Sequence, residues 1–292
     1  MSFFFLFRNN AVTTTQKLLL ALRFYATGSF LISAGDVVGV SKSTACVIVR
    51  DVSVALAQLR PQFIKMPETN DEIKELQKQF YGIAKFPLVI GAIDCTHIKI
   101  QSPGGPNAEY FRNRKGWFSL NVQTVVSAKL KIMDIVVRWP GSTHDSTIFS
   151  RSKINNDLHV EQKWGNSLIV ADSGYANTKH IVTPFLNPQA GPENLYNESQ
   201  IRTRNPVERC YGVLKRRFPV LSLGMRLQIS NIQNVIIACS VLHNIAIDCN
   251  DVMPMDDVQL PDELTELINE PTIENRQNNA RTRLVNEYFS HL

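Results

Sequence analysis

Four carboxylates lie at positions where an acidic side chain is unusual or well placed for chemistry. Asp94 lies inside the apolar segment 87–100, whose residue pattern is typical of a strand. An ionised carboxylate buried in a strand is costly unless a cation or several hydrogen-bond donors compensate it. Asp172 ends a second apolar segment, at the end of a strand where the active sites of α/β sheets lie. Asp145 and Glu208 lie near the starts of two expected helices.

Carboxylates that converge from separate elements would form an all-oxygen pocket, which suits Mg²⁺ or Mn²⁺. Two such ions about 4 Å apart can activate a water molecule and stabilise the leaving oxygen of a phosphodiester. Local structural roles remain open for three of the four side chains. Asp145 could be a helix N-cap, and Asp172 could form an Asx turn with the Ser-Gly pair after it. Glu208 could complete a capping box that begins at Asn205.

Strands are expected to position these carboxylates. Segments 87–100, 120–127 and 132–139 predict a meander of three strands, and 167–175 predicts a fourth strand. Segment 87–100 is apolar on both faces over its first half, as in the central strand of a covered sheet. Segment 120–127 alternates between polar and apolar residues, so it can be half exposed.

Helices are expected around 206–218 and 231–247, after the fourth strand. This order of elements predicts an α/β fold, a mixed sheet with helices on its faces. Residues with even numbers in the first strand should share one face with Asp94. They are Ile90, Ala92, Ile98 and Ile100.

The N-terminal part is expected to be helical. Residues 17–27 predict an amphipathic helix whose apolar face carries Leu18, Leu19, Leu22 and Tyr25. The following segment 35–56 has the spacing of a helix-turn-helix.

Two glycines and a serine set that spacing. Gly35 comes four residues before the turn glycine Gly39, and Ser41 is a good N-cap for the second helix. The exposed side of this second helix would carry polar residues that could meet DNA. They are Lys42, Ser43, Thr44 and Arg50. An ordinary helical hairpin that packs on the core is the alternative.

Composition and charge limit the class of protein. The chain has 292 residues with a net charge of +5, which divides into +11 for residues 1–250 and −6 for residues 251–292. A basic body suits a polyanionic partner, and the acidic tail is expected to be solvated. A hydrophobic fraction of 44% excludes wholesale disorder. No apolar run approaches the roughly 20 residues of a membrane span.

Two further features lead us to expect an intracellular protein. The N-terminal apolar run Phe3–Phe7 is too short for the h-region of a signal peptide. The five cysteines include no C-x-x-C pair, so we expect reduced thiols.

Six basic side chains accompany Glu208 in or just before the expected helix 206–218. They are Arg202, Arg204, Arg209, Lys215, Arg216 and Arg217. We expect them to contact phosphates, which would position a duplex without reading its sequence. A solvated basic surface is the alternative.

Several motifs in fixed order cover most of residues 11–250. They are G-A-I-D-C-T-H-I (91–98), N-R-K-G-W-F-S-L-N (113–121), W-P-G-S-T-H-D-S (139–146), V-A-D-S-G-Y (170–175), N-P-V-E-R-C-Y-G-V-L-K-R-R-F (205–218) and L-H-N-I (242–245). This pattern resembles the transposase-derived nuclease family of Harbinger elements, relatives of the PIF/Harbinger transposases. The 35 residues between Asp172 and Glu208 are also similar to the interval in these DDE enzymes.

The resemblance implies an RNase H-like nuclease domain preceded by a helix-turn-helix segment. Asp94, Asp172 and Glu208 match the catalytic metal ligands, and Asp145 matches a further acidic metal position. The resemblance also implies a divalent metal cofactor (Mg²⁺ or Mn²⁺), DNA as substrate, and a location in the nucleus and cytoplasm. A Myb/SANT-like partner protein is a further expectation.

These features together predict a metal-dependent nuclease that hydrolyses DNA phosphodiester bonds by a two-metal mechanism. The alternative is a domesticated DNA-binding or chromatin-interaction protein without nuclease turnover. We expect a helix-turn-helix segment at 1–62, a linker helix at 63–85, the nuclease domain at 86–250, and an acidic tail with a short helix at 251–292.

Overall fold

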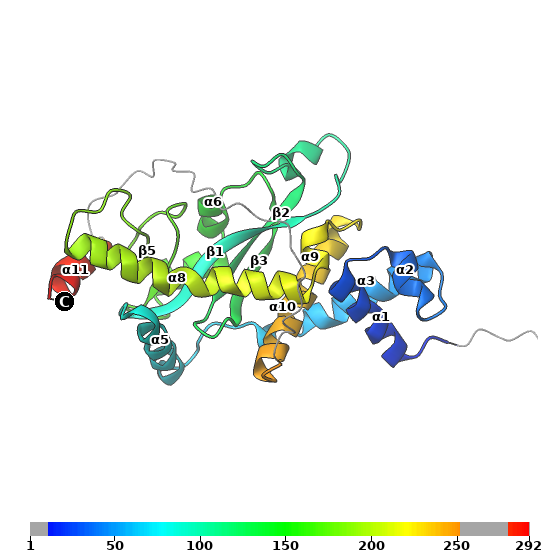
Figure 1. Cartoon of the computed structure of the whole chain (residues 1–292), viewed down its shortest axis with the longest axis horizontal. Helices are drawn as coiled ribbons and strands as arrows, with labels where there is room; N and C mark the ends of the chain where they lie inside the picture. The colour runs from blue at the N-terminus through cyan, green and yellow to red at the C-terminus, as the bar shows by residue number, and fades with distance from the viewer. Residues whose placement is uncertain (1–10, 252–279, 292) are drawn as a thin grey trace, which may run out of the picture.

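The computed structural model of the chain describes residues 11–251 and 280–291. The interpretations of Met1–Phe7 and of most of the acidic tail therefore concern residues outside these ranges. Figure 1 shows an elongated molecule with the N-terminal helices at one end and α11 (Ala280–Glu287) at the other. A sheet lies between these two ends.

A five-stranded mixed sheet forms the middle of the molecule, in the order β3-β2-β1-β4-β5. Strands β1, β2 and β3 form the predicted antiparallel meander, whereas β4 is parallel to both β1 and β5. Their bounds are β1 (Val89–Lys99), β2 (Ser119–Val126), β3 (Ile132–Pro140), β4 (Leu168–Val170) and β5 (Ile181–Val182). The predicted α/β class and the predicted central position of β1 are confirmed.

One expected neighbour of Asp94 lies on the other face of β1. The register between β1 and β4 shifts between Val89 and Gly91. Ala92 consequently packs in the larger core cluster with Ile98, whereas Ile90 packs in the smaller cluster. The prediction that Ile90 shares the face of Asp94 was wrong, because this local irregularity interrupts the strict alternation of side chains.

Strand β2 is buried along its whole length, so the prediction of a half-exposed strand was also wrong. Helix α6 (Asp145–Ser150) packs on β2, and α8 (Pro192–Arg217) packs on it too. Two polar side chains of β2 form hydrogen bonds inside the protein: Asn121 donates to the Thr143 carbonyl at 2.9 Å, and the Thr124 hydroxyl lies 2.9 Å from the Tyr211 hydroxyl. Polar alternation here reflects internal hydrogen bonding and not solvent exposure.

Helices cover the sheet. Helix α8 contacts β1, β2 and β4, and lies lengthwise across the sheet in Figure 1. Helix α10 (Ile229–Asp248) packs on β3. It is long and apolar enough to span a membrane by length and composition alone, but more than half of its most apolar window is buried in the protein. Its hydrophobic residues therefore belong to the core.

Shorter elements complete the description. They are α4 (Arg60–Phe63), α5 (Asn70–Ala84), η1 (Ala108–Phe111), α7 (Lys153–His159), α9 (Val220–Leu223) and η2 (Phe289–His291). Helix α5 falls in the segment expected to be a linker helix. It packs on β1 and α8, with Phe80 fully buried, so it forms part of the covering of the sheet.

The predicted helix 206–218 begins earlier than expected. Helix α8 runs without interruption from Pro192, and Pro206 lies inside it. A proline removes one backbone donor from a helix, and its partner would have been the carbonyl of Arg202. Arg202 is exposed, so water can satisfy that carbonyl. The proline was interpreted as a helix start, and that interpretation was wrong.

The N-terminal segment forms α1 (Thr14–Thr27), α2 (Leu31–Asp36) and α3 (Lys42–Gln58). A side chain at Gly35 would meet the Val40 carbonyl oxygen at 2.7 Å, so only glycine lets the two helices approach here. Gly39 has a φ of +68° in the turn. Ser41 is the N-cap of α3 and accepts from the Thr44 amide, as predicted.

The buried face of α1 differs from the predicted one. Leu20, Ala21, Phe24 and Tyr25 are buried, whereas Leu18 and Leu19 are exposed. Only Tyr25 of the expected face is therefore fully buried.

The N-terminal helices share their core with the sheet. Helix α3 packs on α10, and the buried residues of α1 and α3 belong to the same hydrophobic cluster as the sheet residues Ala92 and Val126. The buried Tyr25 hydroxyl lies 2.6 Å from the Ser53 hydroxyl and joins α1 to α3. The two parts are therefore packed into one body.

Candidate active site

The register of the sheet brings Asp94 and Asp172 to the same edge. Ala92 pairs with Val170 at the last paired position of the parallel strands β1 and β4. Asp94 and Asp172 each follow that pair by two residues, and from there β1 continues in pairing with β2 alone. The two carboxylates thus lie at the carboxyl end of neighbouring parallel strands, where α/β sheets place their functional groups.

Asp145 lies in a helix that packs on β2, the neighbour of β1 in the sheet. It is the first residue of α6, and His144 is the N-cap, so the N-cap interpretation of Asp145 was wrong. The Asn121 amide on β2 donates to Asp145 Oδ1 at 2.8 Å and fixes the carboxylate. Asp145 is therefore held by a side chain of the sheet and not by its own helix terminus.

Glu208 lies in the middle of α8. The capping-box interpretation was wrong because α8 begins at Pro192. One turn further along, the buried Tyr211 hydroxyl donates to the Asp94 carbonyl oxygen at 2.7 Å and fastens α8 to β1. The Glu208 side chain itself is 47% exposed, so this side of the site is open to solvent.

Arg204 links the carboxylates, and sequence reasoning missed this role. Its Nη1 donates to Asp94 Oδ2 at 3.0 Å, and its Nη2 donates to Glu208 Oε1 at 2.6 Å. The guanidinium is only 14% exposed. The four-residue spacing between Arg204 and Glu208 is a signal for such an ion pair, but only if both lie in one helix. Because the predicted helix began at residue 206, Arg204 lay outside it and this ion pair was not predicted.

Two of the carboxylates have raised pKa values. Burial raises the pKa of Asp94 well above its usual value, the charge of Asp172 raises it further, and Arg204 opposes the rise. Burial and then the charge of Asp145 raise the pKa of Asp172, again against the effect of Arg204. Asp172 also interacts with the charge of Glu208. Asp172 thus interacts with the other three carboxylates, and the Arg204 guanidinium bonds to two of the four.

Backbone amides hold the two strand-end carboxylates in place. Asp94 Oδ1 accepts from the Cys95 amide at 2.7 Å. Asp172 Oδ1 accepts from the Gly174 amide at 3.0 Å, which is the Asx-turn contact considered for this residue. The turn orients Asp172 without neutralising it, so the structural and the chemical interpretations of this residue are compatible.

The donor set suits a hard divalent cation. Carboxylate oxygens are the preferred ligands of Mg²⁺ and Mn²⁺, and a buried cluster with excess negative charge gains most from such an ion. Within residues 11–251 and 280–291, however, no three acidic, histidine or cysteine side chains are already grouped as a metal site. Arg204 lies between two of the candidate ligands instead.

The comparison with protein families agrees with this geometry. Residues 93–244 match the family described as DDE superfamily endonuclease, a range that begins one residue before Asp94 and includes all four carboxylates. The chain belongs to the DDE superfamily endonuclease family. The resemblance to Harbinger transposase-derived nucleases is thereby confirmed.

Relatives of this endonuclease family cover most of the chain. A mouse protein named "Putative nuclease HARBI1" is 33% identical over 82% of this chain and 69% of its own length. A protein of the same name from Xenopus laevis is 28% identical over 97% of this chain and 82% of its own length. "Protein ALP1-like" from Arabidopsis thaliana is 26% identical over 83% of this chain and 63% of its own length. No solved structure matches the chain significantly.

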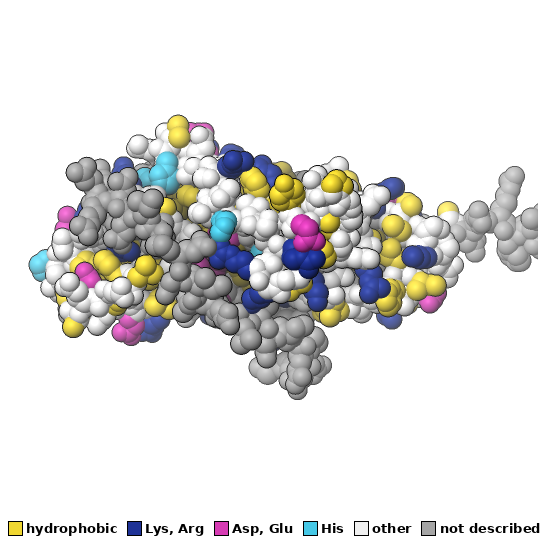
Figure 2. Space-filling view, turned by 90° about the horizontal axis from the view of Figure 1, so that it is seen from above, with side chains coloured by type: hydrophobic (Ala, Val, Ile, Leu, Met, Phe, Trp, Pro, Cys, Tyr) yellow, Lys and Arg dark blue, Asp and Glu magenta, His cyan; other side chains and the backbone are white. Residues whose placement is uncertain are grey.

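Helix α8 of this DDE chain does not present its six basic side chains on one surface. Arg202, Arg209 and Arg216 are exposed and follow one another at seven-residue intervals, which places them on one side of the helix. We call these three residues the α8 arginine stripe. Figure 2 shows basic side chains over the middle of the molecule and towards the N-terminal helices.

The other three basic residues of α8 are engaged inside the protein, which corrects the expectation of a common basic surface. Arg204 pairs with carboxylates, as described above. Lys215 is 6% exposed and donates to the His97 carbonyl oxygen at 3.3 Å. Arg217 pairs with Asp251 and also donates to its carbonyl oxygen at 2.9 Å.

The predicted DNA-contacting residues of α3 are all exposed. The hydroxyls of Ser43 and Thr44 lie 2.9 and 3.0 Å from Ser41 Oγ, so they also take part in capping the helix. Arg50 pairs with Asp51 at 2.9 Å, and Lys42 lies at the start of the helix. Their contact with DNA stays a prediction.

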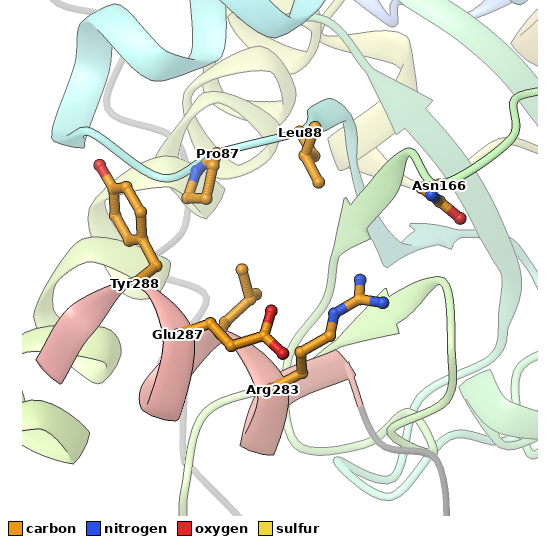
Figure 3. A pocket seen from close by; sticks show the side chains of 7 residues that line it. Pro87, Leu88, Asn166, Arg283, Glu287 and Tyr288 are labelled. Atoms are coloured by element: carbon orange, nitrogen blue, oxygen red, sulfur yellow. The ribbon is translucent and has the colours of Figure 1, made fainter.

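A cavity of about 380 Å³ lies away from the carboxylates (Figure 3). Pro87 and Leu88 line it just before β1, Asn166 lines it before β4, and α11 closes it with Arg283 and Glu287. It is therefore at the amino ends of the parallel strands, whereas Asp172 follows the carboxyl end of β4. The cavity is not part of the candidate active site.

Proposed function

We propose that this chain is a metal-dependent nuclease that hydrolyses phosphodiester bonds of DNA. The observation that carries the proposal is the convergence of Asp94 and Asp172, from neighbouring parallel strands, with Glu208 of α8. The strand order and the mixed directions of the sheet support an RNase H-like fold. The name of the mouse relative supports nuclease chemistry.

Asp94, Asp172 and Glu208, together with Asp145, would hold two divalent cations. When bound, such ions make a water molecule nucleophilic and stabilise negative charge on the leaving oxygen. The protein contributes the orientation of the ligands: the Cys95 and Gly174 amides fix two carboxylates and Asn121 fixes a third. The Tyr211 hydroxyl keeps α8, and with it Glu208, against β1.

The DNA duplex would contact the exposed basic surface next to this site. The α8 arginine stripe lies on the same helix as Glu208, so a phosphate backbone along it would pass the carboxylates. The exposed residues at the start of α3 would bind DNA further along the molecule. A Myb/SANT-like partner and a nuclear and cytoplasmic location remain predictions.

Asp172→Asn tests the nuclease proposal. The change keeps the shape and the Gly174 contact but removes one charged ligand, so we expect cleavage of plasmid DNA in Mg²⁺ or Mn²⁺ to fall by at least about 100-fold. The matched control is Glu198→Gln, because Glu198 is an exposed carboxylate of α8 outside the cluster, and this variant should cleave like the wild type. Equal cleavage by the wild type and Asp172→Asn would reject the assignment.

One observation favours the second candidate, a DNA-binding protein without turnover. Arg204 already bridges Asp94 and Glu208, as a permanent ion pair would in a site that no longer binds metal. In that case the wild type would bind DNA but would not cleave it at any concentration of Mg²⁺ or Mn²⁺.

A further inference from the structure

Arg204 occupies the position between two candidate metal ligands. Its two terminal nitrogens reach Asp94 Oδ2 and Glu208 Oε1 at 3.0 and 2.6 Å. The Asp94 side chain is 15% exposed and that of Arg204 14%, so their contact is well shielded from solvent. An ion pair with this exposure is a much stronger constraint than a pair on the surface.

A guanidinium and a metal ion compete for the lone pairs of these oxygens. Mg²⁺ requires its oxygen ligands at about 2.0–2.1 Å, and Arg204 already occupies a lone pair of Asp94 Oδ2 and of Glu208 Oε1. The positive charge of Arg204 would also repel a divalent ion a few ångströms away.

We propose that Arg204 is a built-in counter-ion of the metal-free site and that it leaves Asp94 and Glu208 when a divalent cation binds. The inference rests on the proposed metal dependence. Arg204 would then set the affinity for metal: it stabilises the empty cluster and competes with the ion that the cluster would otherwise take up. Arg204 would therefore regulate the binding of the divalent cation and take no part in the cleavage of DNA.

The solvent-exposed side of the cluster leaves space for a second conformation of the Arg204 side chain. Glu208 is 47% exposed, and Arg204 is one turn away from it on the same helix. An arginine side chain has enough length and freedom to move from a carboxylate to the solvent side of its helix. The exchange therefore requires a change of side-chain conformation and leaves the main chain of α8 in place.

Arg204→Gln tests this inference by metal binding in the absence of DNA. We expect the variant to bind Mn²⁺ at least about tenfold more tightly than the wild type. Electron paramagnetic resonance of the free ion measures this affinity. Its metal-free melting temperature should fall below that of the wild type, and saturating Mn²⁺ should restore it. The matched control is Arg209→Gln, which removes the same charge from an exposed position of the same helix and should change Mn²⁺ affinity by less than about twofold.

A second measurement follows the wild type directly. Arg204→Lys serves only to assign the guanidinium signals of Arg204 in the nitrogen-15 NMR spectrum. We expect these signals to show restricted rotation without metal and free rotation after titration with Mg²⁺. Unchanged restriction at saturating Mg²⁺ would overturn the inference, as would Mn²⁺ binding to Arg204→Gln no tighter than to Arg209→Gln.

Failure of this inference can be told apart from failure of the proposed function. If the wild type cleaves DNA with Mn²⁺ but Arg204→Gln gains no affinity, the nuclease proposal stands and the counter-ion inference is wrong. If Arg204→Gln gains affinity but no variant cleaves DNA, the site binds metal through the exchange and the nuclease proposal is wrong. If neither the wild type nor Arg204→Gln binds Mn²⁺, both are wrong.

Discussion

Asp94 lies in a strand that carries the buried hydrophobic residues Ala92 and Ile98 on the same face, and its pKa is raised by burial and by the charge of Asp172. A carboxyl group with a raised folded-state pKa destabilises the protein when it is ionised. With respect to this group, the free energy of unfolding is highest below the unfolded-state pKa of about 4. It falls as the pH rises through the folded-state pKa of Asp94, because the carboxyl group then loses its proton in the folded protein. The ionised form of Asp94 is therefore expected to lower the stability of the metal-free chain.

Asp94→Asn should accordingly raise the melting temperature of the metal-free chain near pH 7.5. The amide oxygen can still accept from the Cys95 amide, and the repulsion from Asp172 disappears. The gain should shrink as the pH falls towards about 4, where the wild-type carboxyl is also neutral. Thermal unfolding at several pH values measures the difference. Asp248→Asn, which changes an exposed pair with Lys131, should show no such trend, and a melting temperature for Asp94→Asn below that of the wild type near pH 7.5 would contradict the argument.

At this scale the sequence singles out acidic side chains that the fold brings together, but it does not reveal their electrostatic partners. Asp94 was recognisable because a lone carboxylate in an apolar strand is rare. The Asn121 contact with Asp145 joins residues 24 positions apart, and the Arg204 contact with Asp94 joins residues 110 positions apart. Such contacts depend on how helices dock on a sheet, which no local pattern reports.

Helix α8 shows how one element can serve two partners. Its buried side carries Tyr211 and Lys215, which fasten it to β1, and its exposed side carries the α8 arginine stripe. At 1.5 Å per residue, positions seven apart are about 10.5 Å from one another along the helix, so the stripe extends over about 21 Å. A surface of this length can meet several phosphates of a duplex.

Replacement of Arg202, Arg209 and Arg216 by glutamine should weaken DNA binding and reduce its salt dependence. If each arginine neutralises one phosphate, the slope of log affinity against log salt should become shallower by about 2.7. Binding measured between 50 and 200 mM salt tests this. The matched control replaces three exposed lysines on other elements, Lys65, Lys74 and Lys78. If both triple variants lose the same slope, the stripe has no special role.

The type of an element was predictable where its pattern of apolar and polar residues matches its burial in the fold. The apolar run of β1 and the three-strand meander gave reliable signals because both faces of the sheet are covered by helices. Proline gave a wrong signal at Pro206, because a helix fixed by packing on both sides of that residue can tolerate one missing hydrogen bond. Polar alternation gave a wrong signal in β2, because helices cover the strand and Asn121 and Thr124 bond to neighbouring segments instead of to water.

On the scale of the whole molecule, the N-terminal helices and the sheet share one hydrophobic core, so we expect them to unfold together. The segment boundaries expected from composition do not coincide with a gap in packing, since the core passes from α1 and α3 through α10 to the sheet. Composition and charge cannot reveal this, because a helix that packs on its own segment and one that packs on a neighbouring domain have the same apolar face.

Ile48→Ala tests this unity. Ile48 is 4% exposed within the shared core, so its truncation should lower the free energy of unfolding by about 2–5 kcal/mol. We expect calorimetry to show a single transition at a lower temperature for the entire chain. Val47→Ala changes the neighbouring residue, which is 45% exposed, and should have an effect below about 1 kcal/mol. Two transitions, with only the first shifted by Ile48→Ala, would show that the N-terminal helices fold separately.

The packing of α3 on α10 has a geometric consequence for a DNA-cutting protein. Because α3 packs on α10 within the shared core, we expect the start of α3 and the carboxylate edge of the sheet to keep a constant separation. A duplex that spans both would be held at two points of a rigid body, so the number of base pairs between the bound position and the cut would be set by the protein. Cleavage products would then share one length measured from the bound position, whatever sequence lies in between.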